Sequence, residues 1–420
     1  MEQNIQNPNP NITEINKAKM IKIMSQGTYG CIYRPGFSCT GQTLSTDKYI
    51  TKIQKQKSTS VKETQLGQII INKVPHFDKY FAPVIESCDI SIATIDNEEI
   101  KKCDFIKKDS ENKTAYESRQ YQSNKIKYVG EDTLAKYLLK TYIEKPKIIL
   151  KNIVKTQKYL LDSIKILYDA GIVHLDLKEN NIIMYKTDIP IIIDFGLSYN
   201  IETVASNNYK DVFFTFGPDY GPWCIDICTI TGMVNSMGNE WQTKKVISAH
   251  IIEVLDEFFT KNSAMLDLLD SKERTIFKRN LYEYFNKINE NNDKTWKDIL
   301  DELLKYQNTW DNYSIAVIFL YLLKGLKLDS KHKQFIKINE YIILLKSIIT
   351  SLPNERLTPE DTKIKLKQIF KKVEREPMNN LRKLLNTESK QMENQEQIKS
   401  NIMNNALSER TQEQSIYAKL

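Results

Sequence analysis

Hydrophobic and polar positions divide the chain into a first third typical of short strands and a longer remainder typical of helices. Residues 20–53 contain short apolar runs interrupted by glycines, which predict strands at MIKIMS, CIY and KYITKI. Residues 61–73 have helical spacing. Residues 84–95 and 126–129 read as short strands on either side of a polar stretch, 107–125. This part of the chain therefore predicts a small sheet accompanied by a helix.

Long amphipathic helices are predicted from residue 134 onward. The clearest covers 150–170, where apolar residues recur at positions 150, 153, 154, 160, 161, 164, 167 and 168. Two short apolar strands are predicted at 182–184 and 189–193. Further helices are expected over 244–306, 312–324 and 336–350. The fold class is therefore predicted to be α+β, with a small β-rich part followed by a larger helical part.

The two ends of the chain have a different composition from the rest. Residues 1–18 are rich in Asn, Pro and Gln, and residues 377–420 are polar, so both are expected to be flexible tails. The longest apolar run, 315–323, is shorter than the roughly 18 residues of a membrane span. The first 20 residues are polar and do not resemble a secretory signal. The net charge of +7 is small for 420 residues, so we expect neither nucleic acid nor a membrane as a partner.

Six cysteines are scattered along the chain, at positions 31, 39, 88, 103, 224 and 228. They form no CxxC pair and have no histidine at the spacing of a zinc site. In a chain of this length the pattern favours reduced, packed thiols and a cytoplasmic location.

The densest chemical signal is the stretch His174-Leu-Asp176-Leu-Lys178-Glu-Asn-Asn181, which Asp194-Phe-Gly follows after two short strands. The two motifs resemble the H-x-D-L-K-x-x-N and D-F-G patterns of protein kinases. The resemblance implies that a loop leaving a helix presents Asp176 to a substrate hydroxyl, while the oxygens of Asn181 and Asp194 meet at a magnesium ion. Either motif alone is compatible with an ordinary loop, but both at this separation make a chance match improbable.

The resemblance implies a bilobal protein-kinase fold, with an N-lobe at 19–130 and a helical C-lobe at 131–372. It implies Asp176 and Lys178 as catalytic residues, and Asn181 and Asp194 as magnesium ligands. Because Lys178 follows the Ser/Thr-kinase pattern, the implied reaction transfers the γ-phosphate of ATP, with Mg²⁺, to Ser or Thr hydroxyls of a protein substrate.

The N-terminal part resembles the glycine-rich loop that covers the ATP phosphates in protein kinases. The stretch runs from Ile23 to Ile32, with Gly27 and Gly30 allowing backbone N–H groups to approach phosphate oxygens closely. Ser25 stands in place of the first glycine of the family pattern. A structural turn between two strands would give a similar sequence.

Lys52 ends an apolar strand where such kinases carry the lysine that contacts the α- and β-phosphates. The resemblance implies Glu63, in the following helix, as its partner, although only eleven residues separate the two. An exposed helix carboxylate is the alternative for Glu63.

The segment 126–134 resembles the hinge strand and the start of the next helix. The resemblance implies that backbone groups near Tyr128 and Val129 bind adenine and that Glu131 or Asp132 binds the ribose. An ordinary turn between a strand and a helix is as good an explanation for each of these residues.

Three residues are predicted to be structural. The resemblance implies that Asp311 caps a helix and binds the backbone of the loop 174–181, which we call the catalytic loop. It also implies that Arg356 pairs with an acidic side chain. No A-P-E sequence occurs, and Asp226 is the candidate partner of Arg356.

Two departures from the family pattern bear on regulation and substrate access. Leu175 replaces the arginine that holds a phosphorylated activation loop in many kinases. Residues 230–305 form an insertion with an apolar stripe at 246, 247, 251, 254, 255, 258 and 259. The stripe is expected to pack the insertion onto the C-lobe, and the alternative is a docking surface for a substrate or partner.

Two other functions fit the same residues. One is a pseudokinase that binds a nucleotide or partner protein as a scaffold, and the other is a small-molecule kinase of the same fold. The divergent pattern and the abundance of Lys, Asn and Ile also resemble protein kinases of large DNA viruses, which implies a viral protein in the host cytoplasm or virion. A cellular microbe with an A/T-rich genome would give the same composition.

Overall fold

The computed structural model describes residues 20–27, 30–44, 48–55, 57–95, 97–186, 188–205, 208–290, 292–327 and 336–370. The predicted tails, 1–18 and 377–420, lie outside these residues. The chain forms two compact units, which we call the sheet unit (residues up to 56 and 88–126) and the helical unit (57–87 and from 127 onward). The division into lobes at residue 130 and the bilobal arrangement remain predictions.

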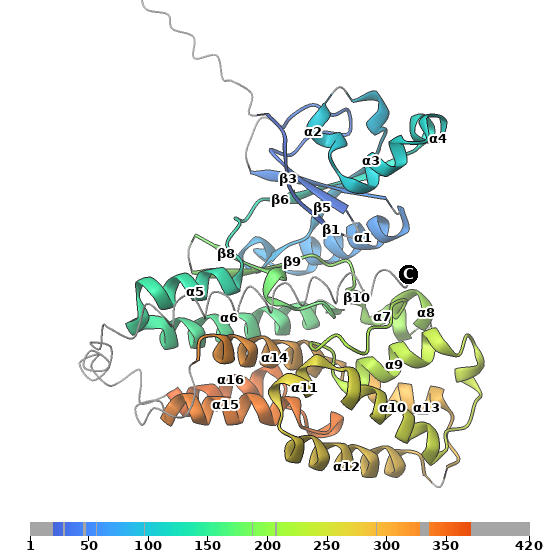
Figure 1. The fold of residues 1–420 in the computed structure, drawn as a ribbon, viewed down its shortest axis with the longest axis vertical. Helices are drawn as coiled ribbons and strands as arrows, with labels where there is room; N and C mark the ends of the chain where they lie inside the picture. Colours follow the sequence, from blue (N-terminus) through green and yellow to red (C-terminus); the bar gives the residue numbers. More distant parts are fainter. Residues whose placement is uncertain are drawn as a thin grey trace, which may run out of the picture. The chain divides into compact units, whose positions relative to one another are not determined.

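The sheet unit is built on five strands in the order β1-β2-β3-β6-β5 (Figure 1). They are β1 (Lys22–Gly27), β2 (Gly30–Arg34), β3 (Tyr49–Gln54), β6 (Tyr121–Lys127) and β5 (Val84–Ile90), whose first residues belong to the helical unit. The first three strands are antiparallel neighbours, and the register places Gly27 opposite Gly30 and Ile32 opposite Lys52. The predicted strands are confirmed, although β6 begins at Tyr121 rather than at residue 126.

Three short helices occupy most of the stretch between β5 and β6, where the sequence predicts a polar connection. They are α2 (Glu98–Lys101), α3 (Asp104–Ser110) and α4 (Lys113–Ser118). Ile100 and Ile106 are completely buried in the core of the sheet unit, together with Tyr33 and Tyr121. Helices α2 and α3 each have one buried residue, and α4 contributes the partly buried Tyr116, which is too sparse a pattern to give a periodic signal.

Four of the six cysteines are paired, which corrects the prediction of reduced thiols. Cys31 is bonded to Cys103, and Cys39 is bonded to Cys88, all within the sheet unit. The partners are 72 and 49 residues apart in sequence, but the fold brings their Cα atoms to 6.0 and 6.1 Å. Such separations leave no local sequence signal, because only the tertiary structure brings the partners together.

The helical unit contains a three-stranded sheet and a bundle of longer helices. The sheet has the order β4-β9-β8, from β4 (Phe81–Ala82), β9 (Ile189–Ile193) and β8 (Ile182–Tyr185). The shorter elements include β7 (Ile172–Val173), β10 (Tyr199–Asn200), α7 (Ile201–Ala205) and α8 (Tyr209–Val212). The longer helices include α1 (Lys57–Lys73), α5 (Leu134–Glu144), α6 (Ile149–Asp169), α9 (Ile225–Ser236), α14 (Trp310–Gly325), α15 (Ile336–Ile349) and α16 (Pro359–Phe370).

Helix α14 is central to this bundle because it is apolar on nearly every face. A helix with this pattern is stable only when surrounded by protein, and almost all of its residues are buried. It packs against α6 on one side and α15 on another, and α16 also contacts α6 (Figure 1). The amphipathic helix predicted at 150–170 is confirmed as α6, whose apolar stripe faces this core.

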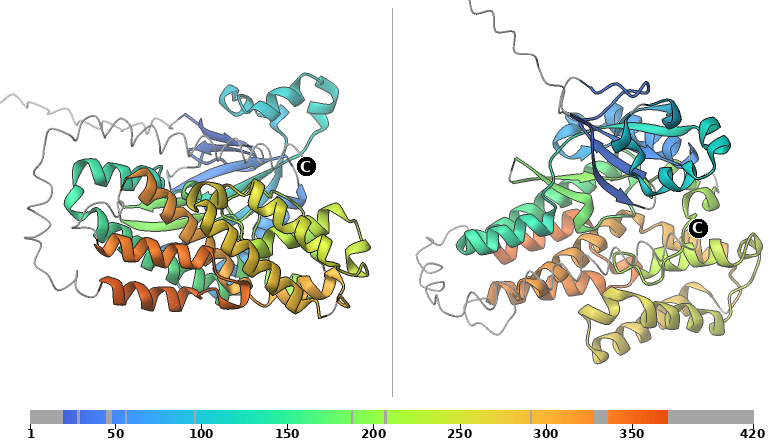
Figure 2. Two further views of the ribbon diagram at one scale, coloured as in Figure 1. Left: turned by 60° about the horizontal axis from the view of Figure 1, so that its bottom comes forward. Right: turned by 45° about the horizontal axis from the view of Figure 1, so that its top comes forward.

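The insertion forms four further helices, α10 (Ser248–Lys261), α11 (Ser263–Leu268), α12 (Ser271–Ile288) and α13 (Trp296–Leu304). Helices α10 and α12 lie side by side in both views of Figure 2. Most of the predicted apolar stripe is buried in the same core as the rest of the helical unit, although Ile247 is 47% exposed. The expected packing role of the stripe is therefore confirmed. None of the described helices is long and apolar enough to cross a membrane.

The cysteine pairing predicts the number of titratable thiols. Protein purified and denatured without reductant should alkylate at two of its six cysteines, and at all six after reduction. In the folded protein, Cys224 and Cys228 should react slowly, because burial raises the pKa of Cys224 to about 12 and that of Cys228 well above its usual value. Mass spectrometry after alkylation measures both quantities. Six alkylated cysteines without reductant would contradict the pairing.

Candidate active site

The hairpin of β8 and β9 positions two predicted magnesium ligands. Its register pairs Ile182 with Ile192, so its open end lies next to those residues. Asn181 immediately precedes β8 and Asp194 immediately follows β9. Antiparallel pairing therefore brings Asn181 and Asp194 to the same end of the hairpin, although thirteen positions separate them in sequence.

Asp176 lies at the centre of a buried polar cluster. Asn181 donates from Nδ2 to the backbone oxygen of Asp176 at 2.8 Å and to its Oδ2 at 3.0 Å. The ammonium of Lys178 is 3.2 Å from the same Oδ2, and the hydroxyl of Tyr220 donates to Oδ1 at 2.7 Å. Because donors reach both oxygens, the carboxylate plane is fixed, and Asp176 is 5% exposed.

Leu175 adopts a left-handed backbone conformation, with φ of 63°, which costs a leucine about 1–2 kcal/mol. Asp311 offsets this cost, because its carboxylate accepts from the backbone N–H of His174 at 2.9 Å and of Leu175 at 3.1 Å. A hydrogen bond to a charged group contributes roughly 1.5–3 kcal/mol. Burial raises the pKa of Asp311, while the neighbouring His174 and the two N–H groups act in the opposite direction.

The predicted backbone contact of Asp311 with the catalytic loop is therefore confirmed. Its predicted role as a helix cap is wrong, because Thr309 is the N-cap of α14 and Asp311 lies in the first turn.

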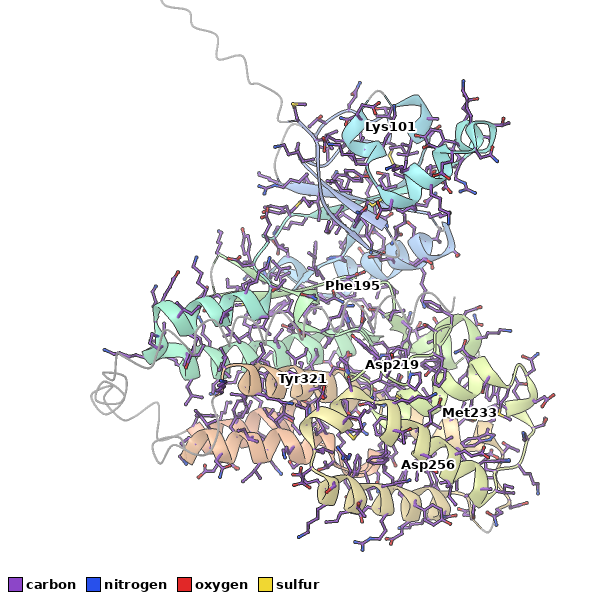
Figure 3. The ribbon with its side chains drawn as sticks, viewed as in Figure 1. Lys101, Phe195, Asp219, Met233, Asp256 and Tyr321 are labelled. Atoms are coloured by element: carbon purple, nitrogen blue, oxygen red, sulfur yellow. A yellow bond between two sulfur atoms is a disulfide. The ribbon has the colours of Figure 1, made fainter. Side chains whose placement is uncertain are left out.

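His174 connects the catalytic loop to Ile193, the last residue of β9. Its Nδ1 accepts from the backbone N–H of Asp176 at 3.2 Å, so the neutral ring carries its proton on Nε2, which faces the oxygen of Ile193 at 3.2 Å. Its ring lies 5.0 Å from that of Phe195, which is labelled in Figure 3. Phe195 in turn meets Phe81 edge to face with centroids 6.1 Å apart. Asp194, like Leu175, has a positive φ, of 62°, which turns the chain sharply at the end of β9.

The predicted hinge residues are attached to the same hairpin. The backbone oxygen of Asp132 accepts from Met184 N–H at 2.8 Å, and Thr133 forms a bridge with Ile183. Thr133 is also the N-cap of α5. Val129 is buried, whereas the side chain of Asp132 is exposed. The predicted hinge segment is therefore attached to the middle of β8, next to the hairpin end that carries Asn181 and Asp194.

The predicted phosphate-binding residues lie in the sheet unit. Ser25 and Gly27 are exposed on β1, whereas Gly30 is buried at the start of β2. A Cβ atom at Gly30 would lie 2.3 Å from the oxygen of Ile53, so this position requires glycine. Lys52 is buried on β3 directly opposite Ile32.

Glu63 is the predicted partner of Lys52. It is buried on α1, in the helical unit, so it is not the exposed helix carboxylate of the alternative reading. The pairing of Lys52 with Glu63 remains a prediction.

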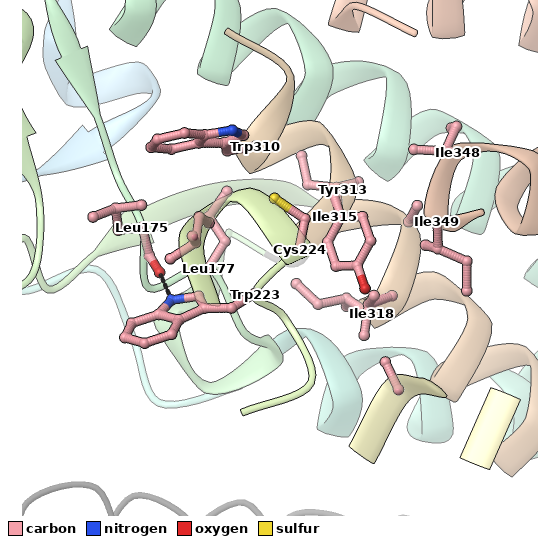
Figure 4. Packing of buried hydrophobic residues seen from close by; sticks show 14 of the residues in the cluster. Leu175, Leu177, Trp223, Cys224, Trp310, Tyr313, Ile315, Ile318, Ile348 and Ile349 are labelled. Atoms are coloured by element: carbon pink, nitrogen blue, oxygen red, sulfur yellow. Dashed lines mark hydrogen bonds between the residues drawn. The ribbon is translucent and has the colours of Figure 1, made fainter. Parts of the chain in front are cut away.

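Two residues that sequence reasoning does not identify contact the catalytic loop. Tyr220 reaches Asp176, and the indole N–H of Trp223 donates to the oxygen of Leu175 at 2.8 Å (Figure 4). Both lie in a segment rich in Gly and Pro. This composition predicts a turn, but it does not predict which loop the turn contacts. The nearest sequence signal was Asp226, three residues after Trp223, which was predicted only as the partner of Arg356.

The donor set at the hairpin end fits magnesium. Asn181 and Asp194 offer amide and carboxylate oxygens, which are hard ligands, and Mg²⁺ commonly takes one or two such side chains and completes its shell with water and phosphate oxygens. Among the described residues there is no group of three or more His, Cys, Asp or Glu side chains that could hold a metal by themselves. The residues present therefore suit a metal that arrives with a phosphate ligand.

Comparisons with known proteins match the region around this cluster. The model of the protein kinase domain family matches residues 107–217. Death-associated protein kinase 2 of mouse and its human counterpart are each 30% identical over 129 residues, covering 26% of this chain. The match covers 34% of each relative, so the chain spans about a third of the curated relatives it matches.

Residues 107–217 are therefore similar to a protein kinase domain. The matched residues 107–217 include Asp176, Lys178, Asn181 and Asp194, and they do not reach Lys52 or the predicted glycine-rich loop. Both relatives are mammalian, so they lend no support to the resemblance to viral kinases.

A buried ion pair joins two segments that are distant in sequence. Arg356 forms a bidentate pair with Asp226, Nη2 to Oδ1 at 2.9 Å and Nη1 to Oδ2 at 3.1 Å. The predicted pairing is therefore confirmed. Burial acts to lower the pKa of Arg356, but the Asp226 carboxylate raises it above the usual value. Asp226 also accepts from the indole of Trp310 at 2.9 Å, next to Asp311.

Replacing Arg356 by alanine should destabilise the protein by roughly 3–5 kcal/mol, because it leaves the Asp226 carboxylate buried without its partner. Urea unfolding followed by tryptophan fluorescence measures this change. The matched control is Lys261→Ala, which removes an exposed pair with Glu257 and should change stability by at most about 0.5 kcal/mol. Equal effects of the two substitutions would show that the buried pair is not structurally important.

Proposed function

We propose that the protein is a magnesium- and ATP-dependent Ser/Thr protein kinase. The observation that carries the proposal is the single buried cluster of Asp176, Lys178 and Asn181, with Asp194 at the same end of the hairpin as Asn181. Phosphoryl transfer requires positioning and charge neutralisation rather than covalent chemistry, and these side chains can supply both.

Each residue of the cluster takes one role in the proposed reaction. Asp176 orients the Ser or Thr hydroxyl and accepts its proton, and Lys178, beside it, stabilises negative charge on the transferred phosphoryl group. Asn181 and Asp194 would hold Mg²⁺, which neutralises the phosphate oxygens when bound with ATP.

The proposed nucleotide contacts follow the resemblance to protein kinases. Lys52 binds the α- and β-phosphates with Glu63 as its partner, and Gly27 and Gly30 offer backbone N–H groups on either side of the loop. Ser25 and Ile32 flank that loop. Val129 contributes backbone groups to adenine and Asp132 a carboxylate to the ribose. The insertion at 230–305 is a candidate docking surface for a protein partner.

Asp176→Asn is the sharpest test of this proposal. The variant keeps the shape of the side chain but loses the proton acceptor, so we expect turnover to fall by roughly 10²–10⁴-fold with the thermal midpoint little changed. Transfer of labelled phosphate from Mg·ATP to generic protein substrates measures the effect. The matched control is Asp188→Asn, an exposed carboxylate paired with Lys155, which should retain full activity.

The same assay separates the three candidate functions. Protein labelling that is lost with Asp194→Ala and with a metal chelator supports the protein kinase. Nucleotide binding without transfer would support a pseudokinase, and labelling of a metabolite alone would support a small-molecule kinase. Near-normal protein labelling by Asp176→Asn would falsify the assignment of Asp176.

Activity should not require phosphorylation of the segment between Asp194 and α9. The position that holds arginine in many kinases is Leu175 here, which is buried and cannot bind a phosphate. Protein treated with a phosphatase should therefore retain its kcat within about twofold. Mass spectrometry confirms removal of phosphate before the assay. Complete loss of activity after treatment would contradict this expectation.

A further inference from the structure

A turn of residues 219–223 lies between the catalytic loop and the junction of α10 and α11. On the catalytic side, Tyr220 donates to Oδ1 of Asp176 at 2.7 Å, and Trp223 donates to the oxygen of Leu175 at 2.8 Å. Both side chains are 1% exposed, and their rings meet edge to face with centroids 5.5 Å apart. The turn therefore contacts both the carboxylate and the backbone of the catalytic loop.

The insertion holds this turn from the opposite side. Asn262, which is completely buried between α10 and α11, donates from Nδ2 to the oxygen of Tyr220 at 3.1 Å and to that of Trp223 at 3.2 Å. Ser263 N–H also donates to the oxygen of Asp219, which is labelled in Figure 3, at 3.3 Å. Three hydrogen bonds to backbone oxygens of the turn thus join it to the junction of α10 and α11.

The chemistry of this junction is specific to asparagine. The Oδ1 atom of Asn262 accepts from Met265 N–H at 3.3 Å and caps α11, while its amide nitrogen satisfies two carbonyl oxygens of the turn. The approach is also close, because a Cβ atom at Gly221 would lie 2.6 Å from the hydroxyl oxygen of Ser263. The junction and the turn therefore fit together without space for a larger side chain at position 221.

We propose that the junction of α10 and α11 is a positioning device for the catalytic loop. Asn262 holds the turn, and Tyr220 and Trp223 transmit its position to Asp176 and Leu175. The inference rests on the proposed kinase function, and it gives the insertion a role at the active site in addition to packing.

The hydrogen bonds of Asp176 indicate where the substrate hydroxyl binds. Two donors, from Lys178 and Asn181, already reach Oδ2, whereas Tyr220 reaches Oδ1. A carboxylate oxygen accepts about two hydrogen bonds. The remaining acceptor site is therefore on Oδ1, beside the hydroxyl of Tyr220. Tyr220 is therefore a positioning residue, which orients Oδ1 of Asp176 toward the Ser or Thr hydroxyl of the substrate.

Tyr220→Phe tests this role with a small change. Removing one hydrogen bond to a charged group should lower kcat by roughly ten- to a hundredfold. The KM for ATP should stay within about twofold, because Tyr220 contacts the catalytic carboxylate and not the predicted nucleotide site. The matched control is Tyr321→Phe, whose hydroxyl bonds Asp267 at the surface and which should keep full activity. An unchanged or increased kcat for Tyr220→Phe would overturn the proposal, and an increase would identify Tyr220 as a gate that competes with the substrate.

Asn262→Asp tests whether the hydrogen bonds from Asn262 to the turn, which we call the clamp, position the catalytic loop. The new side chain has the same shape as asparagine. The substitution places an acceptor oxygen against the carbonyl oxygens of Tyr220 and Trp223, so the turn should loosen. Hydrogen–deuterium exchange should become faster at residues 219–224 and 174–178, and kcat should fall in parallel. The matched control is Asn286→Asp on α12, where the amide donates to the oxygen of Tyr282 at 2.8 Å, and it should leave both segments unchanged.

The exchange measurement keeps this inference separate from the proposed function. If the wild-type protein transferred no phosphate, the proposed function would fail, while faster exchange in Asn262→Asp would still support the clamp. If Asp176→Asn abolished transfer but Asn262→Asp changed neither exchange nor kcat, the kinase assignment would stand and the clamp would be overturned. Should Asn262→Asp fail to fold, Tyr220→Phe decides by kcat and by exchange at residues 174–178.

Discussion

The conformation of the catalytic loop depends on the buried carboxylate of Asp311. This side chain accepts the backbone N–H groups of His174 and Leu175 and thereby stabilises a left-handed leucine that is unfavourable by itself. Asp311 lies on α14, the most completely buried helix, so its position is fixed by packing. The conformation of the catalytic loop is therefore determined by the core of the helical unit.

The other polar groups of the site extend this arrangement. Asp226 binds the indole of Trp310, the residue beside Asp311, and also pairs with Arg356 near the C-terminal end of the described chain. Trp223 packs beneath the catalytic loop, and its indole donates to the oxygen of Leu175. Buried polar groups of this kind are costly when one partner is missing, so the network favours a single arrangement of the loop. Figure 4 shows these indoles among the surrounding apolar side chains.

The sequence predicted the parts of the fold that have a local signal. The strands β8 and β9, helix α6 and the motif residues Asp176, Asn181 and Asp194 are read from apolar runs and fixed spacings. The pairing of Arg356 with Asp226 was also predictable from the resemblance. Helices α2 to α4 were not, because α2 and α3 each have one buried residue and α4 contributes the partly buried Tyr116. The cysteine pairs and the contact of Tyr220 with Asp176 were not either, because they depend on tertiary contacts between residues far apart in sequence.

The replacement of arginine by Leu175 changes how the loop can be held. An arginine at this position holds a neighbouring segment through charge, and the strength of that contact depends on whether a phosphate is present. Leu175 is instead buried among apolar side chains, and its backbone is held by Asp311 and Trp223. Apolar packing and these hydrogen bonds do not depend on covalent modification of the adjacent segment. The conformation of this loop is therefore set by folding, through the packing of Leu175 and its backbone hydrogen bonds with Asp311 and Trp223.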